Sequence, residues 1–171
     1  GRKNLGYLPE DRGLYQKQKL EDILHYFGFL RGLEKKDAEQ KTGLWLERFN
    51  LDGQGIRKVE ELSKGNQQKI QFIIALLHDP ELIILDEPFT GLDPINQLLM
   101  KEIIQEKQNE GKTIIFSTHQ MEQVERLCNN ICLINKGKII LEGSLDNIRN
   151  TYSSNAVEVK FSGEIHRNDV A

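Results

Sequence analysis

The chain of 171 residues has few cysteines and no long apolar run. Its two cysteines, Cys128 and Cys132, lack metal-ligand partners at the usual spacings. We therefore predict buried, reduced thiols rather than a zinc site or a structural disulfide, as in cytosolic proteins. The longest apolar run, Phe72 to Leu77, is far shorter than the roughly 20 residues needed to span a bilayer. These absences indicate a globular, cytosolic protein.

The chain also lacks an excess of positive charge. It has 23 basic and 26 acidic residues, and no basic stripe dominates the sequence. This balance disfavours nucleic acid as the main partner. The length suggests one domain with room for an inserted lobe.

Short apolar runs alternate with segments of helical periodicity, a pattern typical of a parallel α/β sheet. We predict buried strands at 82–85 and 113–117, and the end of another strand before the loop at 9–13. Helices are predicted within 19–50, 63–78, 95–109 and 120–129. A hairpin around Lys136 and Gly137 and a last short helix should follow.

The helical stretch 17–79 is too long for a simple crossover between two strands, so we interpret it as an inserted helical lobe. Its first helix should bury the apolar face formed by Leu20, Ile23, Leu24, Phe27 and Leu30. Asp37 should cap the second helix. The chain is therefore divided into an opening region at 1–16, the lobe at 17–79, the rest of the core at 80–150 and an extension at 151–171. Within the extension, apolar and polar residues alternate at 156–161, which predicts an edge strand.

Two carboxylates, Asp86 and Glu87, directly follow the strand predicted at 82–85. The carboxyl end of such a strand is where open α/β sheets bind their ligands. Asp86 can hold Mg²⁺ there, because Mg²⁺ prefers oxygen ligands, and Glu87 can accept a proton from an attacking water. The alternative is a strand end whose acidic residues only begin a turn.

The segment Leu62–Asn66 stands at the start of the third predicted helix. Ser63 is a good N-cap, which requires no ligand. Capping does not explain Gly65, because glycine inside a helix costs about 1 kcal/mol relative to alanine. A glycine lets another group approach the backbone closely, and a helix N-terminus suits a phosphate. Capping and phosphate binding both remain open.

Asp93 and His119 are two further candidates. Asp93 with Pro94 is also explained as the cap and first residue of a helix. His119 follows the strand at 113–117 and should share the carboxyl edge of the sheet with Asp86 and Glu87. A purely structural histidine is the alternative.

Taken in order, these segments resemble the ATP-binding subunits of ABC-type transporters over residues 5 to about 145. Residues 6–10 are similar to the family's Q-loop region, and 62–66 to its signature sequence. Residues 82–87 resemble its Walker B strand, 90–93 its D-loop and His119 its switch histidine. The resemblance implies an α/β fold, a partial RecA-like P-loop NTPase core with a parallel sheet and an inserted helical subdomain.

The resemblance also implies an activity, ATP hydrolysis coupled to transport, with ATP and Mg²⁺ as cofactors. Two ATPase subunits would pair head to tail around ATP and act with a transmembrane permease on a separate chain, at the cytoplasmic face of the membrane. Asp86 and Glu10 would face the metal, Glu87 would be the general base, and His119 would contact the γ-phosphate. The residues implied on the ATP held by the second subunit, or linking the two sites, are Ser63, Lys64, Gly65, Asn66 and Asp93.

The chain departs from the family pattern because the phosphate-cradling loop G-x-x-x-x-G-K-[ST] is absent from its 171 residues. The family has that loop upstream of the Q-loop, so we expect the C-terminal portion of a longer subunit, inactive alone. Glu10 stands where most of the family has glutamine, and Lys64 and Asn66 replace a glycine and a glutamine. Together, 6–10 and 62–66 are similar to sodium-efflux (NatA-like) exporter subunits.

Two other functions stay open. One is a non-transport relative acting on ribosomes or DNA, and the other is an inactive interaction module. For a transporter, residues 11–15 and the first helix should face the membrane partner, with Leu14 and Tyr15 as apolar contacts. The alternative is that this segment is only a solvated loop.

Overall fold

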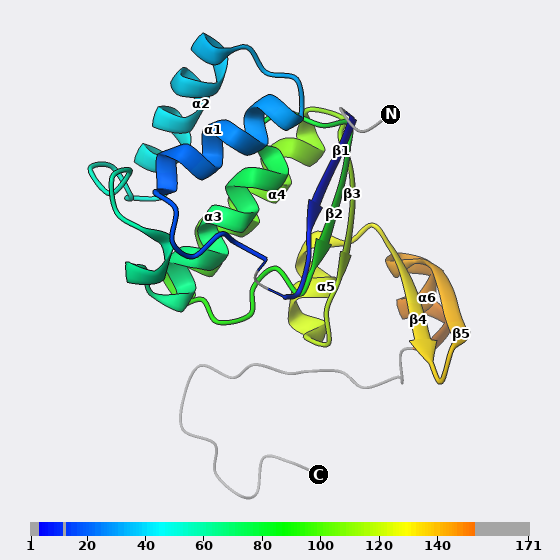
Figure 1. Ribbon diagram of the computed structural model, residues 1–171. Helices are drawn as coiled ribbons and strands as arrows, with labels where there is room; N and C mark the ends of the chain where they lie inside the picture. Colours follow the sequence, from blue (N-terminus) through cyan, green and yellow to red (C-terminus); the bar gives the residue numbers. More distant parts are fainter. Residues whose placement is uncertain (1–3, 12, 153–171) are drawn as a thin grey trace, which may run out of the picture. The chain divides into compact units, whose positions relative to one another are not determined.

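The computed structural model describes residues 4–11 and 13–152. The chain divides into two compact units, residues 1–127 and 128–171 (Figure 1). The predicted lobe at 17–79 lies wholly within the first unit.

The first unit is built on a parallel sheet of three strands. Strands β1 (Leu5–Leu8), β2 (Leu82–Asp86) and β3 (Thr113–Ser117) lie in the order β1-β2-β3. Leu8 is paired with Leu85, and Asp86 with Ser117. The strands therefore end at one edge of the sheet, and the predicted parallel α/β fold is confirmed.

Helices pack against one face of this sheet. Helices α1 (Leu20–Leu30), α2 (Lys35–Arg48) and α3 (Lys64–Leu76), with a 3₁₀ turn at Val59–Glu61, come between β1 and β2 in the chain. Helix α4 (Pro94–Asn109) connects β2 to β3, and α5 (Met121–Leu127) follows β3. Figure 1 shows α3 and α4 beside the strands, with α1 and α2 farther out.

The core lies between the strands and α3. Ile83 and Leu85 of β2 and Phe72 and Ile73 of α3 are almost completely buried. Gly6 of β1 lets α3 come close, because a Cβ at this position would lie 2.1 Å from the carbonyl oxygen of Ala75. The backbones of β1 and α3 therefore pack with no room for a side chain between them.

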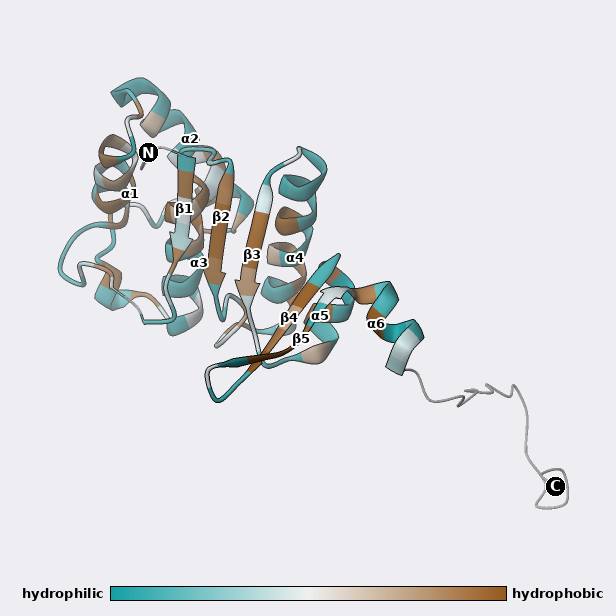
Figure 2. Cartoon of the chain, turned by 90° about the vertical axis from the view of Figure 1, so that its right-hand side faces the viewer, coloured by the Kyte–Doolittle hydropathy of each residue, from teal (hydrophilic) through white to brown (hydrophobic). Residues whose placement is uncertain are grey.

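Within the described part of the first unit, no helix covers the other face of the sheet. Its residues alternate with the core residues along each strand. Tyr7 of β1 and Ile115 of β3 are 47% and 55% exposed, and Ile84 of β2 is half-buried. Figure 2 shows β2 and most of β3 in the brown of hydrophobic residues, whereas β1 is paler. This apolar face is unusual for a parallel sheet, because such sheets are normally covered on both sides.

Two predictions about α1 and α2 are wrong. Leu30 is 59% exposed, and the buried position near this end of α1 is Gly28. A Cβ at Gly28 would lie 3.3 Å from the Cβ of Ala38, so α2 crosses α1 at the glycine and leaves Leu30 outside. Asp37 does not cap α2, because the helix begins at Lys35 after Glu34. Asp37 lies in the first turn, where its charge still suits the helix dipole.

The described part of the second unit is a hairpin and one helix. Strands β4 (Asn130–Asn135) and β5 (Lys138–Ser144) are antiparallel, and α6 (Leu145–Tyr152) follows. Lys136 and Gly137 have φ angles of 49° and 73°, the left-handed pair that a tight two-residue hairpin turn requires. The predicted hairpin and short helix are confirmed. The strand predicted at 156–161 lies outside the described residues.

The cysteines differ in part from the prediction. Both are free, but Cys128 is only half-buried, and Cys132 is exposed like most residues of β4. Partial burial raises the pKa of the Cys128 thiol. None of the described helices combines the length and apolar content of a membrane-spanning segment.

Candidate active site

Three predicted site residues, with Ser117 beside them, gather at the edge where the parallel strands end. Asp86 closes β2 and Glu87 follows it, while Ser117 closes β3 and His119 comes two residues later. The pairing of Asp86 with Ser117 fixes the relative heights of the two strands. The carboxylates and the histidine predicted to share this edge therefore lie together.

Ser117 bridges the two carboxylate residues. Its hydroxyl donates a hydrogen bond to Oδ1 of Asp86. The backbone N–H of Glu87 donates both to the carbonyl oxygen of Ser117, at 3.2 Å, and to its Oγ, at 3.3 Å. Ser117 thus orients the Asp86 carboxylate and holds the backbone of Glu87.

Glu87 is held in an unusual conformation. Its φ of 43° lies in the left-handed region, which is uncommon for a residue with a side chain. Its Oε1 accepts hydrogen bonds from the backbone N–H of His119, at 3.1 Å, and contacts Nδ1 of the same residue at 2.7 Å. Thr90 and Thr118 donate to Oε2 at 3.5 Å. Backbone strain held by surrounding contacts is a feature of functional sites.

Glu87 and His119 differ strongly in exposure. The side chain of Glu87 is 17% exposed, whereas that of His119 is 77% exposed. The carboxylate is therefore fixed and shielded, and the imidazole reaches out beyond it. A fixed carboxylate at a rim can take a proton from a water in front of it, and the histidine is free to meet a ligand.

Glu10 lies in the loop that leaves β1 at the same edge of the sheet. Because Leu8 is paired with Leu85, the residues after β1 leave the sheet beside those after β2. Glu10 is exposed, and among residues 4–11 and 13–152 its side chain makes no hydrogen bond or ion pair. Its position suits the predicted metal-facing role, but the structure does not bring it into contact with Asp86.

Residues 62–66, which resemble the signature sequence, lie at the N-terminus of α3. Ser63 is the N-cap and accepts a hydrogen bond from the N–H of Asn66 at 3.2 Å, while Lys64 is exposed. A Cβ at Gly65 would lie 3.3 Å from the carbonyl oxygen of Gly91. The missing side chain therefore has one explanation inside this chain, the close approach of the loop after Glu87. A bound phosphate is not needed to explain it.

Asp93 caps α4, as predicted. Its Oδ1 accepts from the N–H of Asn96 at 3.0 Å, and its Oδ2 from the side-chain amide of the same residue. These hydrogen bonds lower the pKa of Asp93, and the one from the backbone of Asn96 has the larger effect. Asp93 is exposed, so its charge is available to a partner surface.

The carboxylates at this edge suit a metal ion that takes only one or two ligands from the protein. Among the described residues there is no group of three or more His, Cys, Asp or Glu side chains that could hold a metal ion. Mg²⁺ is often held by one or two carboxylates together with water and phosphate oxygens. Asp86 at this edge is a donor of that kind, so the donor set suits Mg²⁺ accompanied by a phosphate ligand.

Sequence reasoning missed Ser117, Thr118 and Thr90 as supports of the site. Their side chains form hydrogen bonds with Asp86 or Glu87. In the sequence, however, Thr90 and Thr118 look like ordinary polar loop residues, and Ser117 like an ordinary polar residue at the end of a strand. The parallel pairing of the two strands could have identified Ser117, because it brings the last residues of both strands side by side.

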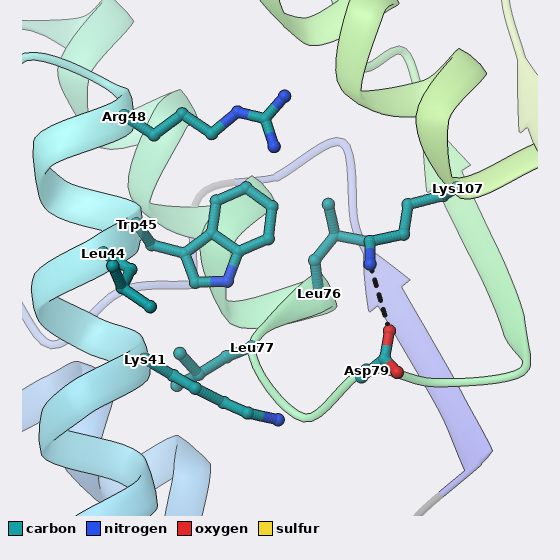
Figure 3. Close-up of a pocket in the computed structure, with 8 residues that line it drawn as sticks. All are labelled: Lys41, Leu44, Trp45, Arg48, Leu76, Leu77, Asp79 and Lys107. Carbon is teal, nitrogen blue, oxygen red and sulfur yellow. Dashed lines mark hydrogen bonds and ion pairs between the residues drawn. The ribbon is translucent and has the colours of Figure 1, made fainter. Parts of the chain in front are cut away.

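A separate pocket of about 340 Å³ lies between α2, the end of α3 and α4 (Figure 3). None of the predicted site residues lines it. Two of its cations are already paired, Arg48 with Glu106 at 2.5 Å and Lys107 with Asp79 at 3.1 Å. We therefore assign it a structural role, in which charged pairs close a gap between helices.

The ion pairs at this pocket predict a pH dependence of stability. Partial burial alone would raise the pKa of Asp79, but hydrogen bonds and charge interactions with Lys107 and Lys112 outweigh burial and lower it. A lowered pKa contributes stability above the unfolded value of about 4, and this stability is lost as the pH falls below that value. Asp79→Asn should therefore lower the free energy of unfolding at pH 7.

We expect the loss to stay below about 1 kcal/mol, because Asp79 is half exposed and solvent screens its charge. Asparagine also tolerates the φ of 53° at this position. Urea denaturation at pH 7 and at pH 3 measures the effect, with Glu39→Gln in an exposed helical pair as the control. A loss of the same size at both pH values would contradict the charge interaction.

Known proteins resemble the chain in sequence and in structure. A family model described as "AAA domain, putative AbiEii toxin, Type IV TA system" matches residues 7–125. The uncharacterized ABC transporter ATP-binding protein YhaQ of Bacillus subtilis is 54% identical over 161 residues, which are 94% of this chain and 54% of that protein. The ABC transporter ATP-binding protein NatA of the same organism is 35% identical, over 92% of this chain and 64% of NatA.

A solved structure described as an ATP binding subunit of an ABC transporter superposes with a TM-score of 0.82 at 32% identity. The match covers 88% of this chain and 63% of that chain. The 171 residues thus span between about half and two thirds of the length of these relatives.

Proposed function

Because the chain belongs to the AAA-domain family and its homologues are ATP-binding proteins of ABC transporters, we propose that it is part of the ATP-hydrolysing motor of such a transporter. The observation that carries the proposal is the Glu87 carboxylate, fixed against His119 and next to Asp86 at the edge of the sheet. The resemblance of residues 6–10 and 62–66 to NatA-like exporter subunits favours an exporter. The motor works at the cytoplasmic face of the membrane.

Each residue at the edge has a proposed role. When bound, Mg-ATP supplies the phosphoryl group that is transferred to water. Asp86 and Glu10 would face the metal, and Ser117 orients Asp86. Glu87 would take the proton of the attacking water, while His119, which contacts Glu87, would also contact the γ-phosphate. Catalysis then depends on positioning and on charge stabilisation more than on covalent chemistry.

The N-terminus of α3 has its proposed role toward a second subunit. Ser63 and Asn66 offer a hydroxyl and a side-chain amide, Gly65 offers a backbone N–H in the first turn of the helix, and Lys64 adds an exposed positive charge. Such a helix end suits a phosphate held by the other subunit of a head-to-tail pair. Asp93, exposed at the start of α4, would link the two sites across that interface.

The first test compares the 171 residues with the complete subunit. The chain contains no phosphate-cradling loop, so calorimetry should detect no Mg-ATP binding of millimolar or better affinity to these residues alone. The complete subunit should bind Mg-ATP, dimerise and turn it over. Tight binding with turnover by the 171 residues alone would contradict the proposal that they need the phosphate-cradling loop of the complete subunit.

An exposed aromatic cluster is the proposed contact with the membrane-embedded partner. Leu14 is only 8% exposed and belongs to the core, so its predicted contact role is wrong. Tyr15 and Tyr26 are 54% and 46% exposed, with ring centres 6.1 Å apart, and both pack on Phe27. Exposed aromatic side chains of this kind often anchor protein interfaces.

Replacing Tyr15 and Tyr26 by alanine should reduce transport by about tenfold or more, because interface tyrosines carry much of the binding energy. ATP turnover by the isolated subunit should persist, because neither side chain reaches the acidic edge. Transport into vesicles and turnover in solution would be measured side by side. The matched control is Tyr152→Ala, since Tyr152 is 70% exposed on α6. Unchanged transport in the double variant would exclude this surface.

A further inference from the structure

Helix α3 carries buried glutamines on the stripe that faces the sheet. Gln68 and Gln71 are 3% and 5% exposed, and Ala75, whose carbonyl oxygen packs against Gly6, continues the stripe one turn later. Burying an amide costs free energy unless its groups are hydrogen-bonded, and an apolar side chain would fill the same space without that requirement. The two amides therefore need an explanation beyond packing.

Each buried amide donates to a loop that carries a site carboxylate. Nε2 of Gln71 donates to the carbonyl oxygen of Asp11, the residue after Glu10, at 3.2 Å. Nε2 of Gln68 donates to the carbonyl oxygen of Pro88, the residue after Glu87, at 3.2 Å. The loops that follow β1 and β2 are thus both tied to one helix, by residues three positions apart.

A third amide on the same helix provides a contrast. Gln67 donates to the carbonyl oxygens of Val59 and Leu62, both at 3.1 Å, in the segment that precedes α3. It makes the same type of hydrogen bond from the adjacent position, but neither of its partners adjoins Glu10 or Glu87. Gln67 can therefore serve as a control, because it is a glutamine of α3 that bonds to a neighbouring segment but not to a loop that carries a site carboxylate.

We infer that Gln68 and Gln71 are positioning residues that make α3 a rigid link between the Glu10 loop and the Glu87 loop. The same helix presents Ser63 and Gly65 at its N-terminus, so the link joins the acidic edge to the end proposed to meet the second subunit. The assignment of a catalytic purpose to this link rests on the proposed function. The mechanical coupling of the two loops does not.

The side-chain amide of Gln71 is only partly satisfied. Oε1 of Gln71 is buried without a hydrogen-bond partner among the described residues. The carbonyl oxygen of Asp11 accepts from Gly13 as well as from Gln71. A buried acceptor without a donor costs free energy, so an amide at this position is explained by the hydrogen bond from its Nε2 to Asp11 and not by packing.

Hydrogen exchange of the complete subunit tests the coupling without any ligand. Gln71→Met and Gln68→Met remove a donor while keeping an unbranched side chain of similar length. Each variant should speed exchange about two- to tenfold, the effect of losing one hydrogen bond, in both residues 10–13 and 87–92. Gln67→Met should affect residues 59–62 only. If each variant affects only the loop to which its own amide is bound, the coupling is overturned.

The functional arm measures how turnover depends on Mg²⁺ concentration. In either carboxylate-loop variant, the half-saturating Mg²⁺ concentration should rise about two- to tenfold, while turnover at saturating Mg²⁺ stays within roughly twofold. A purely structural loss would instead lower turnover at saturating Mg²⁺ in proportion to the folded fraction and leave the half-saturating Mg²⁺ concentration unchanged. If Gln71→Met does not fold, Gln71→Asn, whose shorter amide cannot reach Asp11, takes its place with the same expected outcome.

The two arms separate the possible failures. Coupled exchange in a subunit without ATP turnover would keep the link and reject the proposed function. Normal turnover, with exchange confined to separate loops and an unchanged Mg²⁺ dependence, would keep the proposed function and reject the link.

Discussion

Replacing Glu87 by glutamine in the complete subunit should lower ATP turnover by about 10²–10⁴-fold, the usual effect of losing a general base. Glutamine keeps the length and the acceptor oxygen, so the contacts with His119 and Thr118 can persist. It cannot take a proton from water. The ATP-bound dimer should therefore still form, and it should last longer than the wild-type dimer because ATP is not consumed.

Turnover by phosphate release and dimerisation by size-exclusion chromatography measure the two halves of this result. Glu81→Gln is the matched control, because Glu81 stands before the opposite end of β2 and pairs with Lys112. It should leave turnover unchanged. If Glu87→Gln keeps wild-type turnover, Glu87 has no part in the chemistry. If the parent subunit itself shows no turnover, the inactive interaction module becomes the better description.

Replacing Gly6 by alanine should destabilise the fold more than any surface change, by about 3 kcal/mol or more. The added Cβ would lie 2.1 Å from the carbonyl oxygen of Ala75 and 2.9 Å from Cγ of Pro80. Both neighbours belong to α3 or to the tight connection after it, so neither can move aside as a flexible side chain would. The helix must move away from β1, which opens the core between them.

The control for this prediction is another glycine-to-alanine change, in the middle of α2. A Cβ at Gly43 would meet nothing within 4 Å, and the residue is exposed. Gly43→Ala should therefore stabilise the protein by about 0.5–1 kcal/mol, because alanine loses less backbone freedom in a helix. Urea denaturation compares both variants with the parent. A neutral Gly6→Ala would show that α3 can retreat from β1 at little cost.

The strands and their edge could be predicted because the signal is local and strong. The run from Leu82 to Leu85 is apolar at every position, so it indicates a strand buried in a parallel sheet. Once the strands are parallel, the carboxylates after one and the histidine after the next must meet at one edge. The gathering of Asp86, Glu87 and His119 follows from that geometry.

Other features depend on where distant parts of the chain meet, and local patterns do not report this. Leu30 has the right helical spacing for burial, but the crossing of α2 at Gly28 leaves it exposed. Leu14 lies in a polar loop and still enters the core, while its neighbour Tyr15 stays outside. The left-handed backbone of Glu87 results from its hydrogen bonds across to β3, which no pattern around residue 87 encodes.

The open face of the sheet has a consequence for the protein in the test tube and in the cell. Tyr7, Ile84 and Ile115 present apolar surface, and β1 and β3 are both outer strands of the three-stranded sheet. Such surfaces recruit other chains, so solutions of these 171 residues should scatter light increasingly with concentration and bind hydrophobic dyes. During synthesis, the same face is one that chaperones would shield until a covering layer is in place.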